Sequence, residues 1–241
     1  MIPLLLPITE LSLSHEDWQT LEQVISELSQ TIPISCVIGY GSLFNGTAQP
    51  HSDVDLLILS KSQIHEKHLI QRHRTFEVVH IGIRRFMAML EKGHVCYVPA
   101  MLEAKVLYDA PNLTPRMSDI AQARYQAGPS ATQDSMFLPR LRSRISTLYS
   151  DMQDSLDNTA TFQLLHIQLI SAFYTYLCTV NNAWGKGEKH MFAHIELLSE
   201  SAHKRIINSL SVSREHDKHQ QISALLEEHN VLITNEVIRY A

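Results

Sequence analysis

The distribution of strand-like segments along the chain is the feature that most constrains its fold. Apolar, β-branched runs suited to strands occur at residues 34–40, 53–59, 75–83 and 104–109, and such signals largely disappear after the segment AGPSATQDS at residues 127–135. The later segments have helical patterns instead, at residues 136–156, 158–185, 190–210 and 218–230. We therefore predict a front domain of strands and helices at residues 1–128 and an all-α domain at residues 129–241.

The front domain also contains two segments with helical signals. Residues 14–30 form an amphipathic pattern, and Ser14 followed by Asp17 has the spacing of a capping box, which predicts that a helix begins there. A second pattern at residues 84–93 ends at Gly93, which predicts a short helix after the third strand-like run.

Residues 158–185 test whether the chain is a soluble protein. They contain no Asp, Glu, Lys or Arg, and the segment is long enough to cross a bilayer. Polar residues interrupt it, however, and its apolar residues recur at helical spacing: Phe162, Leu165, Leu169, Phe173, Leu177 and Val180. We predict a buried helix of the all-α domain and no membrane partner.

Composition and charge narrow the compartment and the partners. The chain carries a formal net charge of −5, which argues against a long nucleic acid as its main partner but not against a nucleotide. Its three cysteines are far apart and not in metal-binding spacing, which fits a reducing compartment. The apolar start MIPLLLP is too short for a signal peptide and lacks preceding basic residues. We expect a cytoplasmic protein.

Two aspartates open the second strand-like run. Side chains alternate along a strand, so Asp53 and Asp55 share one face while Val54, Leu56 and Ile58 share the other, toward a core. Two carboxylates this close repel each other unless a cation lies between them, and carboxylate oxygens suit Mg²⁺. The pattern therefore predicts a magnesium site, and Mg²⁺ is usually partnered by phosphates.

Gly41 and Ser42 follow the first strand-like run. A glycine there allows a tight turn and close approach to a ligand, and backbone N–H groups with a serine hydroxyl can hold phosphate oxygens. Asn45-Gly46 marks a turn in the loop that follows. Glu77 lies early in the third run and would meet both aspartates if that strand pairs beside the second.

The segment YGSLFNGTAQPHSDVDLL resembles the signature of the polymerase-β nucleotidyltransferase superfamily. It has Gly-Ser, then ten residues, then Asp-Val-Asp, with Glu77 at the place of the acid on a later strand. It is most similar to the aminoglycoside adenylyltransferase branch, over about residues 36–83. The resemblance implies an α+β fold, in which a short mixed sheet with helices on one side is followed here by a helical bundle.

The same resemblance implies a role for each residue of the motif. Gly41 and Ser42 would hold the triphosphate of ATP or another nucleoside triphosphate (NTP). Asp53, Asp55 and Glu77 would be the catalytic carboxylates and would bind two Mg²⁺ ions, with Glu77 as metal ligand or general base. The reaction would be in-line attack of an acceptor hydroxyl on the α-phosphorus, with release of pyrophosphate.

Further candidates lie in the all-α domain. Trp184, Lys186, Glu188 and Lys189 fit a flap over an active site, in which Lys189 contacts phosphate and Glu188 acts as an acceptor-side base; a plain loop between helices is the alternative. Arg140, Arg142 and Arg144 fit clamps on the triphosphate, or a solvated face paired with Asp151 or Asp154. His190 and His194 lie one helical turn apart, and we expect them on the surface or in packing.

These features together predict a Mg²⁺-dependent nucleotidyltransferase, and an adenylyltransferase in particular. Its partners would be a nucleotide and a hydroxyl-bearing small molecule such as an aminoglycoside, and a homodimer is left open. Two alternatives stand beside this hypothesis: transfer of AMP to a protein, and a non-catalytic, nucleotide-binding regulatory module.

Overall fold

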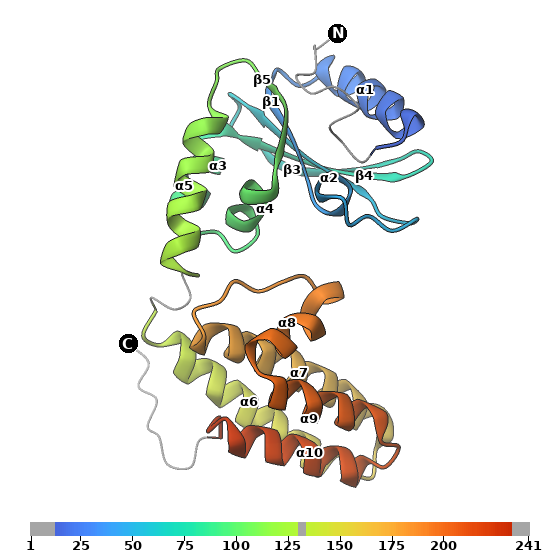
Figure 1. Ribbon diagram of the computed structural model, residues 1–241, viewed down its shortest axis with the longest axis vertical. Coiled ribbons are helices and arrows are strands. Elements are labelled where there is room, and N and C mark those ends of the chain that lie inside the picture. The colour runs from blue at the N-terminus through green and yellow to red at the C-terminus, as the bar shows by residue number, and fades with distance from the viewer. Residues whose placement is uncertain (1–12, 130–133, 233–241) are drawn as a thin grey trace. The chain divides into compact units, whose positions relative to one another are not determined.

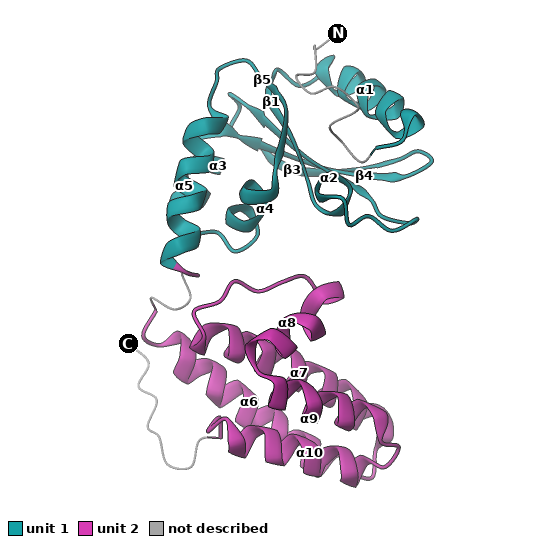
Figure 2. Ribbon diagram, in the orientation of Figure 1, with its two compact units in different colours: residues 1–127 teal, residues 128–241 magenta. Residues whose placement is uncertain are grey.

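The computed structural model describes residues 13–129 and 134–232, and the chain divides into two compact units at residues 1–127 and 128–241 (Figure 2). The first unit is built on one five-stranded sheet, in the order β3-β4-β2-β1-β5 (Figure 1). Its strands are β1 (Ile34–Tyr40), β2 (Val54–Ser60), β3 (His65–Gln71), β4 (Thr75–Gly82) and β5 (Lys105–Asp109). Strands β2 and β4 pair in parallel and the other neighbours are antiparallel, so the sheet is mixed.

Helices cover both faces of this sheet (Figure 1), so the expectation of helices on one side is wrong. On one face, α1 (His15–Ser29) and α2 (Ser42–Asn45) share a buried core with the side chains of Val37, Val54, Leu56, Ile58, Phe76 and Val78. On the other face lie α3 (Ile83–Glu91), α4 (Tyr97–Glu103) and α5 (Thr114–Ala127) (Figure 1). The central strands are therefore apolar on both faces, which explains why β1 and β2 read as continuous apolar runs.

The start of α1 confirms the predicted capping box. The Ser14 side chain accepts a hydrogen bond from the Asp17 backbone N–H, and the Asp17 carboxylate accepts one from the Ser14 backbone. These two bonds satisfy backbone donors that an uncapped helix would leave without partners. Helix α3 is also present as predicted, and Gly93 follows it in the left-handed region at φ 71°.

The second unit is all-α, as predicted. Its helices are α6 (Phe137–Asp154), α7 (Thr159–Val180), the 3₁₀ helix η3 (Glu188–His190), α8 (Met191–Leu198), α9 (Glu200–Ser211) and α10 (Glu215–Glu228). The predicted helical segment at 190–210 is divided, because Ser199 leaves the helical conformation and its side chain caps α9 by accepting from the Ala202 N–H. The unit has its own apolar core, to which α6, α7, α8, α9 and α10 all contribute.

The uncharged segment forms the helix at the centre of this core. Phe162, Leu169, Phe173 and Leu177 of α7 are buried, and they lie among buried side chains of the neighbouring helices. Within residues 13–129 and 134–232, no helix combines the length and apolarity that a membrane span requires. The periodicity of this segment therefore reflects packing inside the second unit.

Candidate functional site

Three carboxylates meet at one end of the sheet in the first unit. Asp55 and Glu77 are direct neighbours in the parallel register of β2 and β4, and Asp53 lies immediately before β2. One carboxylate oxygen from each of the three lies within 4.8 Å of the other two, and all three residues are partly exposed. The strand pairing that the sequence hypothesis required for Glu77 is present.

Strand alternation explains why these carboxylates point away from the α1 core. Val54 and Leu56, on either side of Asp55, are buried in that core, so Asp55 must face the opposite side of the sheet. Phe76 and Val78, on either side of Glu77, are buried in the same core, so Glu77 also faces the opposite side of the sheet. Because β2 and β4 are parallel and in register, both strands begin at the same edge and present their acids together.

Gly41 brings the end of β1 against the same carboxylates. Its φ is 78°, in the left-handed region that L side chains rarely adopt. A Cβ atom placed on Gly41 would collide with the Asp55 carboxylate. Both the backbone conformation and the closeness of Asp55 therefore require glycine at this position.

Ser42 begins the short helix α2, where the sequence predicted only a polar loop. Its partly exposed side chain follows Gly41 directly, while Leu43 and Phe44 are buried and hold α2 in the core. The predicted turn at Asn45-Gly46 is confirmed, since Gly46 ends α2 in the left-handed conformation. The first backbone N–H groups of such a turn have no partner within the helix and are available to a ligand.

Lys67 of β3 is a site residue that sequence reasoning missed. Its ammonium Nζ lies 2.6 Å from Glu77 Oε2. The hydrogen bond with Glu77 raises the pKa of Lys67, and the nearby charges of Asp55 and Asp53 act in the same direction. A cationic group therefore already lies beside the carboxylate cluster.

Tyr40 is the neighbour of Asp55 on the other side of β2, in the antiparallel register with β1. Its ring lines a small apolar cavity together with Ile38, Leu57, Phe86, Tyr97, Ala100 and Met101. Burial raises the pKa of Tyr40, and the Asp55 carboxylate adds to the effect, so the phenol stays neutral at physiological pH.

A partly buried ion pair fixes the loop that precedes Asp53. Arg74 donates from Nε to Asp17 Oδ1 at 2.7 Å, and from Nη1 to the backbone carbonyls of Pro50 and Ser52, both at 3.0 Å. His73 Nε2 lies 2.7 Å from the same Asp17 oxygen. These contacts tie α1, the start of β4 and the loop before β2 together, so they position Asp53.

The sequence-predicted residues of the second unit belong to a separate body. Lys189 and Glu188 are exposed in η3, and Lys186 lies in the loop before it. The Lys186 backbone N–H donates to Tyr174 Oη at 2.6 Å, and Tyr174 Oη lies 2.8 Å from His194 Nδ1, so this loop is held against α7 and α8. Trp184 is buried in the same loop.

Arg140 and Arg142 of α6 have partners within the second unit. Arg142 Nε donates to the Val231 carbonyl at 3.1 Å, next to the end of α10. Arg140 Nη1 lies 4.0 Å from the Asp134 carboxylate. The hydrogen bond from Arg142 therefore has a structural role, because it joins α6 to the segment that follows α10.

Comparisons with known proteins agree with this geometry. Residues 21–88, from α1 to α3, match the nucleotidyltransferase domain family, and the match includes Gly41, Ser42 and all three carboxylates. A nucleotidyltransferase-like protein from Exiguobacterium sibiricum 255-15 has a similar structure, with a TM-score of 0.52 and 10% identity, over 87% of this chain and 74% of that one. At this identity the likeness concerns the fold alone. No curated protein matches the sequence.

The comparisons therefore confirm the predicted fold: a mixed five-stranded sheet with helices of the nucleotidyltransferase type, followed by a helical region. They also identify a nucleotidyltransferase domain within the first unit. The narrower likeness to aminoglycoside adenylyltransferases has no support among them.

The residues present fit a magnesium site. The donors are all carboxylate oxygens, which Mg²⁺ prefers, and they lie close enough to share an ion. The Asp55 carboxylate occupies the space that a side chain at position 41 would fill, so Gly41 lets this carboxylate stay within the cluster. The Lys67 ammonium beside Glu77 shows that the cluster attracts a cation. Three carboxylates and one ammonium leave two negative charges, so one Mg²⁺ would balance the site before a triphosphate brings negative charge for a second ion.

Proposed function

We propose that this protein transfers a nucleoside monophosphate from an NTP, with ATP as the first donor to test, to a hydroxyl group of an acceptor. The observation that carries the proposal is the meeting of Asp53, Asp55 and Glu77 within 4.8 Å of one another, beside the Gly41-Ser42 turn. The match of residues 21–88 to the nucleotidyltransferase domain family supports the reaction class.

Each residue of the site has a role in this proposal. Asp53, Asp55 and Glu77 bind Mg²⁺, of which we propose two ions. Bound there, Mg²⁺ would neutralise charge on the triphosphate and hold the attacking and leaving oxygens in line. Ser42 and the backbone N–H groups at the start of α2 hold triphosphate oxygens, as Gly41 allows the ligand to approach.

Glu77 is the proposed proton acceptor. The acceptor hydroxyl forms its bond to the α-phosphorus while its proton passes to the Glu77 carboxylate, and the bond from the α-phosphorus to the leaving oxygen breaks to release pyrophosphate. Lys67 must move away from Glu77 first, because its ammonium lies against the oxygen Oε2. Once released, Lys67 becomes a cation available to the phosphates.

The acceptor is proposed to be a small molecule with hydroxyl groups. An aminoglycoside is the first class to test, because the motif suggested it and because the net charge of −5 is compatible with a polycation. Lys189 and Glu188 remain proposed contacts to phosphate and acceptor from the second unit.

A second candidate function is a non-catalytic nucleotide-binding module. The Lys67–Glu77 ion pair favours it, because a lysine that permanently neutralises the third carboxylate would take the place of a metal ion. The two functions differ in one observable, the release of pyrophosphate from NTP.

The test is a transfer assay with labelled NTPs, with pyrophosphate release measured in parallel. The purified protein is offered a panel of aminoglycosides and other polyhydroxylated small molecules in one arm and a protein lysate in the other. The small-molecule proposal predicts label on the panel; label on lysate proteins would instead support AMP transfer to a protein. Glu77→Gln should keep the fold and lower turnover by about 10²–10⁴-fold, the usual contribution of a general base.

The matched control is Glu91→Gln, which changes an exposed glutamate at the end of α3 in the same unit. It should leave turnover unchanged. A Glu77→Gln protein that turns over at the wild-type rate would remove Glu77 from the site. If no NTP releases pyrophosphate with any acceptor, the non-catalytic function becomes the better account.

A further inference from the structure

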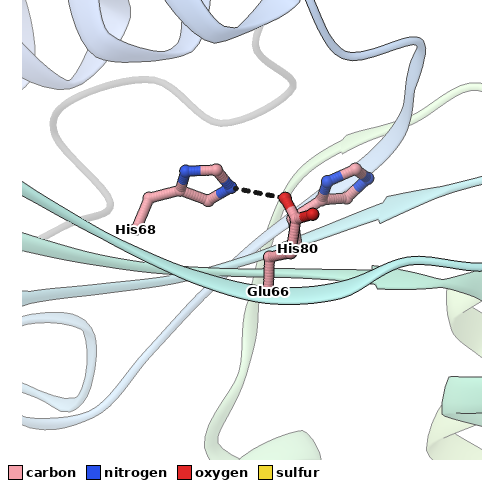
Figure 3. A group of neighbouring side chains, drawn as sticks. All are labelled: Glu66, His68 and His80. Carbon is pink, nitrogen blue, oxygen red and sulfur yellow. Dashed lines mark ion pairs between the residues drawn. The ribbon is translucent and has the colours of Figure 1, made fainter.

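A second group of metal-ligating side chains lies in the β3–β4 hairpin, outside the proposed active site. Glu66 and His80 are direct neighbours in the antiparallel register, and His68 lies two residues beyond Glu66 on the same face (Figure 3). One ligand atom from each lies within 4.8 Å of the other two. Two imidazoles and a carboxylate form a donor set that suits Zn²⁺.

The group is separate from the three carboxylates of the proposed active site. Lys67 lies between Glu66 and His68 on β3, so its side chain points to the opposite face of the sheet, toward Glu77. His80 lies three residues beyond Glu77 on β4, so its side chain points to the face opposite Glu77, which is the face of Glu66 and His68. None of the proposed nucleotidyl-transfer residues is shared with this group.

His80 has the supporting contact that metal-binding histidines usually have. It is only 2% exposed, and its Nε2 lies 2.8 Å from the hydroxyl of the buried Ser60. A metal-binding imidazole commonly uses its second nitrogen to donate to an oxygen acceptor, which fixes the ring and its tautomer, and the Ser60 hydroxyl oxygen can accept such a bond. With Nε2 next to Ser60, Nδ1 is the nitrogen that remains for a metal, and Figure 3 shows the His80 ring beside the Glu66 carboxylate.

His68 supplies an independent sign of a missing ligand. Its Nε2 atom is buried and has no hydrogen-bond partner, although a buried polar nitrogen normally has one. Its nearest charged neighbour is Glu66 Oε2 at 3.6 Å, beyond hydrogen-bond distance. Two ligands of one tetrahedral Zn²⁺ are separated by about 3.4 Å, from bond lengths of about 2.0–2.2 Å. The pair thus has the separation of two zinc ligands.

We propose that Glu66, His68 and His80 bind one divalent transition-metal ion, with Zn²⁺ as the preferred ion and water as the fourth ligand. Glu66 is exposed and His68 is partly exposed, which gives the ion a route from solvent. The bound ion ties β3 to β4 across their register. Because Lys67 and Glu77 lie on these two strands, the ion also fixes the hairpin that carries them.

The test is titration of the full chain, purified without a polyhistidine tag, with Co²⁺ and then Zn²⁺. Co²⁺ reports its coordination through visible absorption, and calorimetry gives affinity and stoichiometry for Zn²⁺. All proteins carry Asp53→Asn and Asp55→Asn, which leaves Glu77 as the one carboxylate of the three-carboxylate cluster and removes that competing metal site. Cys96 is the exposed cysteine, and absence of a thiolate band in the Co²⁺ spectrum shows that it is not a ligand.

The proposal predicts one equivalent of tetrahedral Co²⁺, displaced by Zn²⁺, and a higher melting temperature with Zn²⁺. His68→Gln should weaken binding by at least about tenfold, since even losing a supporting contact to a ligand costs about 10–100-fold. His68 is partly exposed, so this variant is expected to fold. His65→Gln is the control, because it removes an exposed histidine of the same strand that faces the other side.

Two results would overturn the proposal. One is the absence of saturable Co²⁺ or Zn²⁺ binding to the otherwise unchanged chain. The other is equal affinity in the His68→Gln and His65→Gln proteins, which would place the ion elsewhere. Neither result depends on nucleotidyl transfer, so this inference and the proposed function can fail separately.

Discussion

Asp55 and Glu77 lie opposite each other in the parallel register of β2 and β4. They are 22 positions apart in the sequence, and the intervening chain forms β3 on the outer side of β4. This parallel connection places the N-terminal ends of β2 and β4, and hence the two carboxylates, at the same end of the sheet. With Asp53 the pair becomes a three-carboxylate cluster, and the predictions below follow from how that cluster is neutralised, approached and held.

Lys67 is predicted to compete with the metal for Glu77. Lys67→Gln removes the ammonium that lies 2.6 Å from Glu77 Oε2 and so increases the negative charge of the cluster. In the absence of nucleotide, affinity for Mg²⁺ should rise by up to about fivefold, equivalent to the ~1 kcal/mol upper range of an exposed ion pair. Calorimetric titration with Mg²⁺ measures this. Lys61→Gln, at an exposed lysine, serves as control, and unchanged affinity in Lys67→Gln would contradict the competition.

Gly41 is predicted to be essential for binding of Mg²⁺ and NTP. Gly41→Ala places a Cβ against the Asp55 carboxylate at a φ of 78°, which should lower the free energy of unfolding by about 1–3 kcal/mol. The displaced carboxylate should weaken binding of Mg²⁺ and ATP by at least about tenfold. Gly187→Ala is the control, since its φ is −58° and a Cβ there meets no atom within 4 Å. Equal behaviour of the two variants would refute this account of Gly41.

Arg74 is predicted to stabilise the first unit far more than its neighbour Arg72. Arg74→Met leaves the nearly buried Asp17 carboxylate without its guanidinium and frees the loop before Asp53. The loss should be about 1.5–3 kcal/mol, as for a hydrogen bond to a charged group, because Asp17 keeps its contacts with Ser14 and His73. Arg72→Met breaks an exposed pair of the same length with Glu27 and should cost no more than about 1 kcal/mol. Denaturant unfolding compares them, and similar losses would be inconsistent with this difference in burial.

Asp17 is predicted to make stability depend on acid pH. Burial raises the pKa of Asp17, but hydrogen bonds from His73, Ser14 and Arg74 outweigh it and lower the pKa from 3.8 to about 2. A lowered folded-state pKa stabilises the fold above pH 3.8, and this contribution of roughly 2 kcal/mol is lost as pH falls from about 4 to about 2. The stability difference between wild type and Asp17→Asn should shrink across that range. A stability difference that stays constant over this pH range would show that the pKa of Asp17 is the same in the folded and the unfolded state.

Much of the fold could be predicted from local pattern. The first strand-like run coincides with β1, and those at 53–59, 75–83 and 104–109 match β2, β4 and β5 to within a residue at each end, because apolar, β-branched segments between turn residues have few other solutions. Strand alternation alone predicted that Val54, Leu56 and Ile58 point into a core, and these side chains are buried against α1. The helical second unit followed from its periodicity.

Strand β3 could not be predicted in the same way, and with it Lys67 was missed. The segment HEKHLIQ lies at the edge of the sheet, where most of its side chains are exposed. A strand with so few buried side chains does not need alternating apolar residues, so its sequence lacks the pattern that predicts a strand. The contacts of Arg74 with Asp17 and with the loop before Asp53 were also out of reach. They join residues up to 57 positions apart, and only the tertiary fold brings them together.

Calorimetric titration of ATP into the purified protein, with and without Mg²⁺, tests the three-carboxylate site most directly, because it requires no knowledge of the acceptor. The same titration of an Asp53→Asn, Asp55→Asn protein, with Asp119→Asn as an exposed control, assigns the binding to the cluster. Binding that needs both Mg²⁺ and the two aspartates is the predicted result. Binding that is equally tight without Mg²⁺, or in the double variant, would contradict the assignment of these carboxylates to the donor site.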